Sequence, residues 1–259
     1  MIFHGLEKNS LVEWPGKVSA VLFLGGCSFR CPFCYNRDLV LACQKLPTLT
    51  EKRILSFLEK RKKFLDGVMI TGGEPLLQNR LEELIEFIKK VRALSLGVGI
   101  ESNGSNPEAL EKLIKEELID YVAMDIKAPI SFLRKGKTKS SIHHARRIGG
   151  EEGQTSSKYE QLTGVKVDLK KIKKSIRLIR KSGIEYEFRT TVAPLLSEED
   201  ILQIAKELKG VERFALQVFR PVDTLINPKL AKMKFFAKEK LEKIGQKIKD
   251  NFKKFEIRG

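Results

Sequence analysis

Short apolar runs alternate with longer amphipathic stretches along most of the chain. The short runs are rich in Val, Ile, Leu and Phe, as expected for strands that are covered on both faces. Six of them are predicted strands: Ser19–Leu24, Val68–Thr71, Gly97–Ser102, Tyr121–Ile126, Glu187–Val192 and Phe214–Phe219. A further run, Phe255–Arg258, could add a final strand.

Stretches with apolar residues at helical spacing lie between these runs. Asn106-Pro107 combines an N-cap with proline at the first helical position, and Ser197-Glu-Glu-Asp200 is a capping box. The predicted helices include Thr50–Leu65, Leu81–Leu94, Asp168–Lys181 and Lys238–Phe252. Because strands and helices alternate, the sequence predicts an α/β fold with a parallel sheet. Six βα units predict a partial (β/α)6 TIM-like barrel that is open on one side.

Polar or glycine-rich motifs follow four of the predicted strands. In barrels of this kind the chemistry lies at the carboxyl ends of the strands, so these motifs are candidate site segments. They are Gly25-Gly26-Cys27, Gly72-Gly73-Glu74-Pro75, Ser102-Asn103-Gly104 and Asp125-Ile126-Lys127.

One segment, residues 132–157, breaks this rhythm because it is basic, polar and rich in Gly and Ser. It predicts a flexible surface insertion in an otherwise single domain that spans residues 1–259. No apolar run reaches the roughly 18 residues that a membrane span needs. The start, MIFHGLEKNS, lacks the pattern of a signal peptide. We therefore expect a cytoplasmic protein without membrane contact.

The formal net charge of +16 favours acidic partners, such as nucleic acid, an acidic protein or an anionic surface. Well-solvated lysine-rich helices would explain the same charge without any partner. The charge therefore restricts the partners and does not identify one.

Three of the four cysteines lie close together, in Cys27-Ser-Phe-Arg-Cys31-Pro-Phe-Cys34. Structural zinc sites and ordinary iron–sulfur clusters take four protein ligands. Three thiols would leave one iron of a [4Fe-4S] cluster open to a small molecule. The fourth cysteine, Cys43, follows an apolar run, where a buried apolar role is expected. A zinc site completed by Cys43 or by a histidine stays open as the alternative.

The CxxxCxxC spacing after an apolar strand, with Phe33 before the last cysteine, resembles the signature of the radical S-adenosylmethionine (radical SAM) superfamily. Thr71-Gly72-Gly73-Glu74-Pro75 is similar to the GGEP motif of that superfamily. The resemblance implies that Cys27, Cys31 and Cys34 hold one [4Fe-4S] cluster. It also implies that the glycine backbone and the Glu74 carboxylate receive the methionine ammonium, since glycines permit close approach and a carboxylate balances an ammonium.

A closer resemblance is to the activating enzymes of glycyl radical enzymes. The segments Gly5–Lys17 and Phe23–Cys27 are most similar to the activating proteins of anaerobic (class III) ribonucleotide reductase, with pyruvate formate-lyase activating enzymes close by. The family usually has His at position 35 and Asp at positions 13 and 101, where this chain has Tyr35, Glu13 and Glu101. The resemblance extends over nearly the whole chain except residues 132–157, through Glu101–Gly104, Tyr121–Pro129, Tyr186–Pro194 and Leu216–Pro221.

The resemblance also assigns residues to the cofactor and the substrate. The cofactor-binding residues that it implies are Phe33, Tyr35, Thr71, Gly72, Gly73, Glu74, Ser102, Asn103, Asp125 and Arg189. Lys127 joins the three cysteines as a catalytic residue, because it would contact the cofactor or the substrate glycine. A monovalent cation could lie near Asp125. Salt bridges from Lys127 or Arg189 to Asp125 or Glu101 at the barrel rim are the structural alternative.

The implied reaction is one-electron cleavage of S-adenosylmethionine at the reduced cluster. The 5′-deoxyadenosyl radical would then remove a hydrogen atom from a glycine of a partner, expected to be anaerobic ribonucleotide reductase. Flavodoxin or ferredoxin, both typically acidic, would donate the electron. Two alternatives remain: a radical SAM enzyme that acts on a small molecule or RNA base, and a non-catalytic iron–sulfur or zinc protein. Nucleic acid is not favoured, because the basic insertion lacks interleaved aromatic residues for stacking.

Overall fold

The computed structural model describes residues 1–131 and 157–259. Its main feature is a sheet of eight strands in the order β10-β9-β8-β7-β6-β5-β3-β2. Neighbouring strands are parallel from β3 to β10, and β2 is antiparallel to β3. The bounds are β2 Gly5–Ser10, β3 Ser19–Leu24, β5 Gly67–Gly72, β6 Gly97–Ser102, β7 Tyr121–Asp125, β8 Glu185–Val192, β9 Arg213–Val218 and β10 Lys254–Arg258. A separate two-stranded ribbon pairs β1 (Ile2–Phe3) with β4 (Leu49–Thr50).

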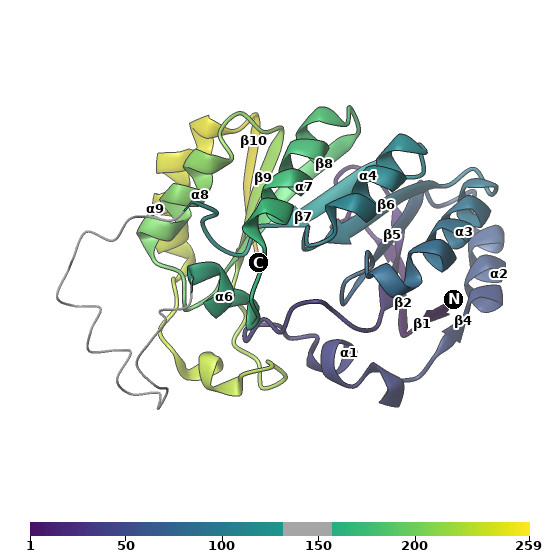
Figure 1. Ribbon diagram of the computed structural model, residues 1–259, viewed down its shortest axis with the longest axis horizontal. Helices are drawn as coiled ribbons and strands as arrows, with labels where there is room; N and C mark the ends of the chain where they lie inside the picture. The colour runs from purple at the N-terminus through teal and green to yellow at the C-terminus, as the bar shows by residue number, and fades with distance from the viewer. Residues whose placement is uncertain (132–156) are drawn as a thin grey trace.

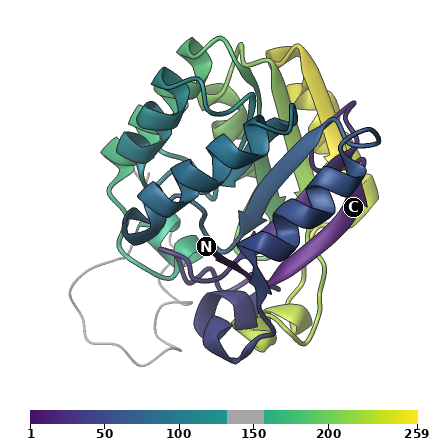
Figure 2. The ribbon, with the colours of Figure 1, turned by 90° about the vertical axis from the view of Figure 1, so that its right-hand side faces the viewer.

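The larger helices lie on one side of the curved sheet, as Figure 1 and Figure 2 show. They are α2 Glu51–Arg61, α3 Leu81–Arg92, α4 Pro107–Lys115, α7 Leu169–Lys181, α8 Glu198–Glu207 and α9 Lys238–Ile248. The shorter helices are α1 Arg37–Leu41 and α6 Lys158–Thr163, with 3-10 turns at Cys43–Lys45, Gln78–Arg80, Pro228–Lys232 and Lys249–Asn251. Among the described strands, the edges β2 and β10 do not pair with each other, so the barrel is open as predicted.

All six strands predicted from the sequence are present, and the additional run is β10. The predicted caps are also confirmed: Asn106 Oδ1 accepts from Ala109 N, and Ser197 forms a capping box with Asp200. Two helices are shorter than predicted, because α2 ends at Arg61 and α9 gives way to a 3-10 turn after Ile248. The alternation of strands and helices was therefore easier to predict than the residues at which the helices end.

Strand β2 and helix α6 were not predicted. The sequence of β2, GLEKNS, is too polar to resemble a buried strand, and it forms an edge of the sheet. Helix α6 starts directly after the predicted insertion. Of that insertion, only Ser157 is among the described residues, where it caps α6; residues 132–156 lie outside them.

One sheet takes strands from near both ends of the chain, which favours the predicted single domain. In the described part of the chain, no helix combines the length and the apolar character needed to cross a lipid bilayer.

The two faces of the sheet carry different side chains. Alternate residues such as Leu22, Ile70 and Val122 belong to the main core, which also includes the inner sides of the helices. Their neighbours along the strands, among them Met69 and Tyr121, form a smaller core on the other face. Towards the carboxyl ends of the strands this second face becomes polar, with the carboxylate of Glu101 and the guanidinium of Arg189.

Trp14 closes the amino end of the concave face. Its indole is 3% exposed and stacks on Tyr121, with ring centroids 5.3 Å apart. The first residues of β5 and β6 are Gly67 and Gly97, and Cβ atoms there would lie 2.7 and 3.0 Å from the indole. The loop between β2 and β3 therefore closes the amino end of the barrel with the Trp14 indole. Gly67 and Gly97 leave room for this ring because they have no side chains.

This packing predicts that Trp14→Ala destabilises the protein by about 3–5 kcal/mol, because it leaves a cavity where the indole was. Urea unfolding followed by circular dichroism would measure the loss. Val12→Ala, on the same loop but 62% exposed, should change stability by less than about 0.5 kcal/mol. Equal unfolding midpoints for the two variants would contradict the assignment of Trp14 as a plug.

Candidate active site

The loops after β3 and β5 touch through their backbones at the carboxyl edge of the sheet. Gly73 N donates to Leu24 O and Glu74 N donates to Gly26 O, both at 2.8 Å. A Cβ atom on Gly73 would lie 1.7 Å from Gly26 O, so a side chain does not fit there. Gly72 has a φ of +114°, a conformation that favours glycine. The Gly-Gly-Glu turn and the cysteine loop (residues 25–34) are thereby fixed relative to each other.

Cys27, Cys31 and Cys34 are all free thiols on this loop. Cys27 Sγ lies 3.7 Å from Asn103 Nδ2, on the turn after β6. Burial raises the pKa of Cys27 to about 11, and the charge of Glu74 contributes to that rise. Burial likewise raises the pKa of Cys31 to about 12. Without iron, these thiols are therefore neutral at physiological pH.

The donor set fits a [4Fe-4S] cluster better than a single metal ion. Among residues 1–131 and 157–259, no three His, Cys, Asp or Glu side chains lie close enough to hold one ion. In a cluster each thiolate binds a different iron, so the three sulfurs need not converge on one point. Binding to iron would also ionise thiols that burial keeps neutral.

Glu74 is 1% exposed, and both oxygens of its carboxylate accept bonds from the protein. Oε1 accepts from Ser102 Oγ at 2.9 Å and from Leu76 N at 3.1 Å, and Oε2 accepts from Asn103 N at 2.7 Å. Burial raises the pKa of Glu74 to about 7, although these bonds favour the charged form. The carboxylate thus ties the turn after β5 to the turn after β6, in addition to any role towards an ammonium.

Asp125 and Lys127 form an ion pair at the end of β7, with 2.7 Å between Lys127 Nζ and Asp125 Oδ2. The ammonium also lies 5.6 Å from the centre of the Phe33 ring, within cation–π range. Desolvation opposes the charge on Asp125, but Lys127 and Arg189 together bring its pKa below the usual value. The salt bridge expected as the alternative is present, and it places the Lys127 ammonium beside the cysteine loop.

Arg189, on β8, is the centre of a charge network on the concave face. Its side chain is 4% exposed and lies 2.8 Å from Glu101 Oε1 and 3.2 Å from Glu13 Oε2. Asp125 Oδ1 and Glu187 Oε1 are each 3.7 Å from Arg189 Nε. Burial opposes the charge of the guanidinium, but the charges of Glu101, Asp125 and Glu187 raise its pKa. Arg189 therefore stays charged; its terminal nitrogens pair with Glu13 and Glu101, and its Nε has no hydrogen-bond partner among the described residues.

Glu13 and Glu101 are paired carboxyl groups beside this guanidinium. Desolvation and the charge of Glu101 raise the pKa of Glu13 to about 7. Burial opposes ionisation of Glu101, but Arg189 lowers its pKa below the usual value. Thr71 Oγ1 also donates to Glu101 Oε2. Close to neutral pH the pair therefore shares one proton, held mainly by Glu13.

One sequence expectation needs adjustment. Cys43 is half-buried and not a core residue; it sits behind the cysteine loop, where a Cβ on Gly25 would lie 2.8 Å from its sulfur. The side chain of Tyr35 is 61% exposed, which is compatible with a role for its backbone. The other predicted site residues do gather at the carboxyl edge.

Two arginines at or near the site were not found from the sequence. Arg80 donates to Gly25 O and so braces the cysteine loop. Arg258, on β10, makes two 2.8 Å bonds to the buried carboxylate of Glu187 and neutralises it. Arg80 lies in a short 3-10 turn and Arg258 in the last strand, and neither belongs to a motif, so the sequence held no signal for them.

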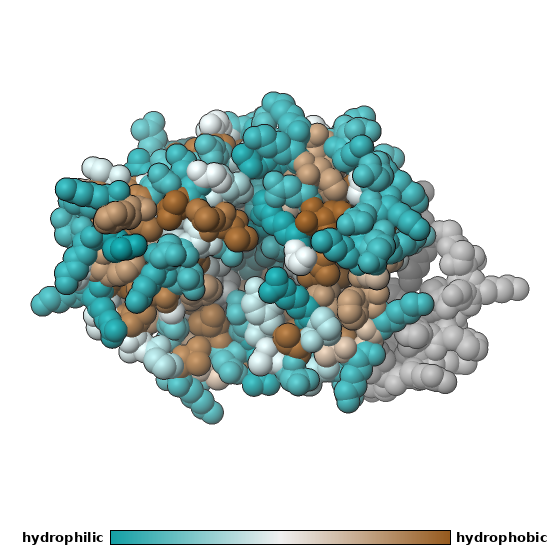
Figure 3. Space-filling model, turned by 180° about the vertical axis from the view of Figure 1, so that it is seen from behind, coloured by the Kyte–Doolittle hydropathy of each residue, from teal (hydrophilic) through white to brown (hydrophobic). Residues whose placement is uncertain are grey.

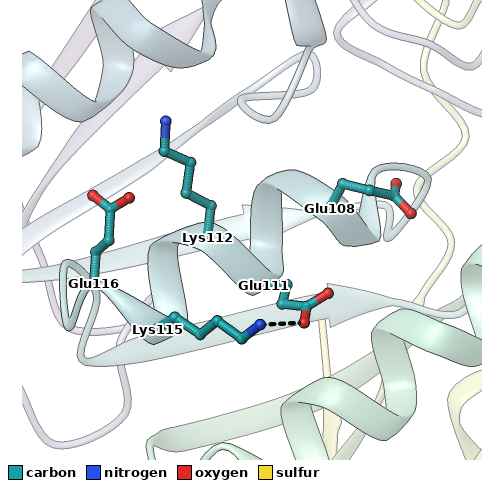
Figure 4. Close-up of a pocket in the computed structure, with 5 residues that line it drawn as sticks. All are labelled: Glu108, Glu111, Lys112, Lys115 and Glu116. Atoms are coloured by element: carbon teal, nitrogen blue, oxygen red, sulfur yellow. Dashed lines mark ion pairs between the residues drawn. The ribbon is translucent and has the colours of Figure 1, made fainter.

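The molecular surface agrees with a site on the concave side. Figure 3 shows that side hollowed near its middle, with hydrophilic side chains around the hollow. A shallow depression elsewhere holds none of the predicted site residues. It lies on α4 and is lined by Glu108, Glu111, Lys112, Lys115 and Glu116, as Figure 4 shows.

The chain matches the Radical SAM superfamily over residues 21–208. It belongs to the radical SAM superfamily. A short match of residues 237–254 to the LPS binding domain of CAP18 (C terminal) covers only the basic helix α9 and its flanks, and assigns no family. The solved structure of TYW1 with a lysine-pyruvate adduct is 16% identical, with a TM-score of 0.55 over 90% of this chain and 74% of that chain, which supports the fold alone.

Sequence relatives narrow the family. The chain is 36% identical, over 96% of its length and 94% of the relative's, to the "Putative glycyl-radical enzyme activating enzyme MJ1227" of Methanocaldococcus jannaschii. It is 36% identical to the pyruvate formate-lyase-activating enzyme of Listeria monocytogenes, over 48% of this chain and 52% of that one. It is 26% identical to the anaerobic ribonucleoside-triphosphate reductase-activating protein of Escherichia coli, over 56% of this chain and the whole of that one. The chain is therefore a radical SAM enzyme of the glycyl-radical-enzyme activating type.

The contact between Gly73 and Gly26 predicts that Gly73→Ala loses the cluster but keeps the fold. The added Cβ would push the cysteine loop away from the Gly-Gly-Glu turn. We expect several-fold less iron per chain after anaerobic reconstitution, with an unchanged circular dichroism spectrum. Gly183→Ala is the control, because nothing lies within 4 Å of a Cβ there; its φ of +76°, which Gly73 does not share, makes it the more strained backbone of the two. Wild-type iron content in Gly73→Ala would refute the role of this contact.

The shared proton at Glu13 predicts a pH dependence of stability. A carboxyl whose pKa is raised from 4.5 to about 7 contributes stability that is complete below 4.5 and is lost as the pH rises through 7. Glu13→Gln cannot ionise, so its melting temperature should fall less than that of wild type between about pH 5 and 8. The melting temperature of Glu13→Gln should still fall slightly with pH, because the pKa of Glu74 is also raised. Glu242→Gln, on the exposed face of α9, should follow wild type; parallel curves for Glu13→Gln would contradict the shared proton.

Proposed function

We propose that this protein uses one [4Fe-4S] cluster and S-adenosylmethionine to install a glycyl radical in a partner enzyme, with anaerobic ribonucleotide reductase as the preferred partner. The observation that carries the proposal is the packing of a three-thiol loop against the Gly72-Gly73-Glu74 turn at the open edge of the sheet. The names of the relatives from Methanocaldococcus and Escherichia favour the same partner class.

Bound together, the reduced cluster and S-adenosylmethionine would supply a 5′-deoxyadenosyl radical able to remove a hydrogen atom from a glycine α-carbon. The chain's part is to hold and orient. Cys27, Cys31 and Cys34 would each bind one iron, which leaves one iron for the cofactor. The half-buried glycines of the turn would offer their backbone to the methionine end, and Ser102 and Asn103 are held beside them by Glu74.

Lys127 is the proposed catalytic side chain at the other margin of the cysteine loop. Its ammonium is held in place by Asp125 and by the Phe33 ring, from where it would contact the cofactor or the substrate glycine. Arg189 would act indirectly, because its guanidinium holds the carboxylates of Asp125 and Glu101 in position. Tyr35 would contribute its backbone to the adenine, and Thr71 would position Glu101.

The charges around Asp125 fit a monovalent cation poorly. The carboxylate already has Lys127 Nζ at 2.7 Å and Arg189 Nε at 3.7 Å. A metal cation placed there would meet two resident positive charges. We therefore propose that Arg189 and Lys127 supply the positive charge at this position, and that the enzyme needs no added cation.

The proposed partners follow from the open barrel and the charge. A polypeptide segment can approach the carboxyl edge from the side that the helices leave free. The electron would come from an acidic flavodoxin or ferredoxin, favoured by the net charge of +16. Neither a membrane nor nucleic acid is part of the proposal. A cytoplasmic location suits a chain whose four cysteines are all free thiols.

The proposal predicts that the anaerobically reconstituted protein forms 5′-deoxyadenosine from S-adenosylmethionine when dithionite is added. Cys27→Ala should abolish this product, because it removes a cluster ligand. Cys43→Ala is the matched control and should retain the product, because its thiol is not a ligand. A loaded wild-type protein that forms no 5′-deoxyadenosine would refute the enzymatic proposal, and loss of product in Cys43→Ala would indicate a four-cysteine site.

The partner is tested in the same reaction by electron paramagnetic resonance. Addition of anaerobic ribonucleotide reductase should give the doublet of a glycyl radical, and replacing its radical glycine by alanine should remove the doublet. Turnover stimulated only by a small molecule or by RNA would overturn the proposed partner and favour another radical SAM reaction.

A further inference from the structure

Four exposed basic side chains lie on or next to the outer side of the cysteine loop. We call Arg30, Lys166, Lys170 and Lys171 the outer basic patch. Within residues 1–131 and 157–259, none of the four makes a salt bridge. The Arg30 guanidinium donates to Cys27 O at 2.6 Å and to Phe29 O at 2.8 Å, so it rests directly on the backbone beside a cluster ligand.

The α6–α7 connection brings the three lysines towards this loop. Arg30 N donates to Thr163 O at 2.8 Å, and a Cβ on Gly164 would lie 2.3 Å from Arg30 O. Lys166 follows two residues later, and Lys170 and Lys171 belong to the first turn of α7.

The other flank of the loop is joined to α7 as well. Ser28 Oγ lies 2.9 Å from Ser105 Oγ, and Ser175 Oγ donates to Gly104 O at 2.8 Å. Lys171 is one helical turn before Ser175. Both flanks of the cysteine loop are therefore bound to the segment that carries the patch.

The segment that carries the three lysines has an excess of positive charge. Residues 158–181 contain nine Lys and Arg but only two acidic residues, Glu160 and Asp168. Both acids are occupied as helix caps, since Glu160 accepts from Ser157 N and Asp168 accepts from Lys170 N. Lys174 lies on α7 as well, but it pairs with Glu108 and Glu111 of α4, each at 3.2 Å. Figure 4 shows these two glutamates on α4.

The outer side is also the side on which the cysteine loop is exposed to solvent. Ile226 N donates to Cys34 O and Asn227 N donates to Pro32 O, so the loop after β9 covers another side. The inner side faces Asn103 and Lys127, where the cofactor would lie. Ser28 and Arg30 are the exposed residues between Cys27 and Cys31. Ser28 Oγ also accepts from Asn103 Nδ2 at 2.9 Å, so Arg30 is the one of the two that belongs to the outer side alone.

We propose that the outer basic patch is the docking site of a small acidic electron-transfer protein, which delivers the electron to the cluster through the cysteine loop. The inference rests on the proposed function, because it needs the cluster. In the transfer the donor is oxidised by one electron and the cluster is reduced by one; no bond forms or breaks. Opposite charges beside the exposed backbone of the cysteine loop would speed the encounter and make it sensitive to salt.

The test reverses the three lysines in one variant, Lys166→Glu/Lys170→Glu/Lys171→Glu. None of them touches the proposed cofactor site, and acidic residues in the first turn of α7 favour the helix. The probe is oxidised flavodoxin, and its dissociation constant is measured by titration calorimetry from about 0.1 M salt upwards, where the Debye length is about 10 Å or less. We expect binding to weaken by about tenfold or more, and the wild-type constant to rise with salt.

The matched control is Lys243→Glu/Lys249→Glu/Lys254→Glu, which changes the net charge equally on and beside α9. It should bind flavodoxin within about twofold of wild type, since long-range charge is screened. Equal weakening in both variants would show that only net charge matters and would overturn the docking site. Wild-type affinity in the first variant, or no binding by wild type, would overturn it as well.

Cleavage of S-adenosylmethionine driven by dithionite separates this inference from the proposed function. The patch variant should keep dithionite-driven formation of 5′-deoxyadenosine and lose most of the flavodoxin-driven rate. If wild type forms no product with dithionite, the proposed function fails. If wild type forms product with dithionite, and flavodoxin supports the same rate in wild type and in the patch variant, only the docking site fails.

Discussion

The backbones of Gly73 and Gly26 meet more closely than any residue with a side chain allows. This contact aligns the two loops on which the chemistry depends, since one carries the thiols and the other leads into Glu74. The parallel register of β3 and β5, with Leu24 opposite Gly72, brings the loops to the same height. The bonds made by Glu74 extend the alignment to the turn after β6. The site is therefore rigid before anything binds, as catalysis by orientation requires.

A second constraint is the charge on the concave face. Arg189 is surrounded by carboxylates, and removing it would leave buried acids without a partner, at a cost of about 3–5 kcal/mol for such a break. Glu187 would compete for the guanidinium, but Arg258 from the last strand neutralises it with two bonds. The final strand thus contributes to the site without reaching it, because it leaves Arg189 available to Glu101 and Asp125.

Sequence patterns predicted the parallel strands and the motif positions well, because buried strands and glycine turns restrict which residues can stand there. They did not predict β2, whose edge position tolerates GLEKNS. The partners of each charge were also beyond the sequence. That Glu74 would bond to Ser102 and Asn103, or Arg258 to Glu187, depends on register between strands far apart in the chain. Local composition contains no record of such contacts, whereas the spacing within one loop is enough to propose the three cysteines as ligands.

The fold covers its sheet unevenly, and this unevenness suits the proposed reaction, which would involve two protein partners. Helices bury one face, and Trp14 fills the other face only at its amino end. The carboxyl half of the concave face consequently carries charged groups, and it lies on the side where a peptide segment can enter. The cysteine loop stands at the margin, with one side towards that face and one side towards solvent at Ser28 and Arg30. An electron entering from the solvent side would reach the cysteines without crossing the space that a substrate loop must occupy.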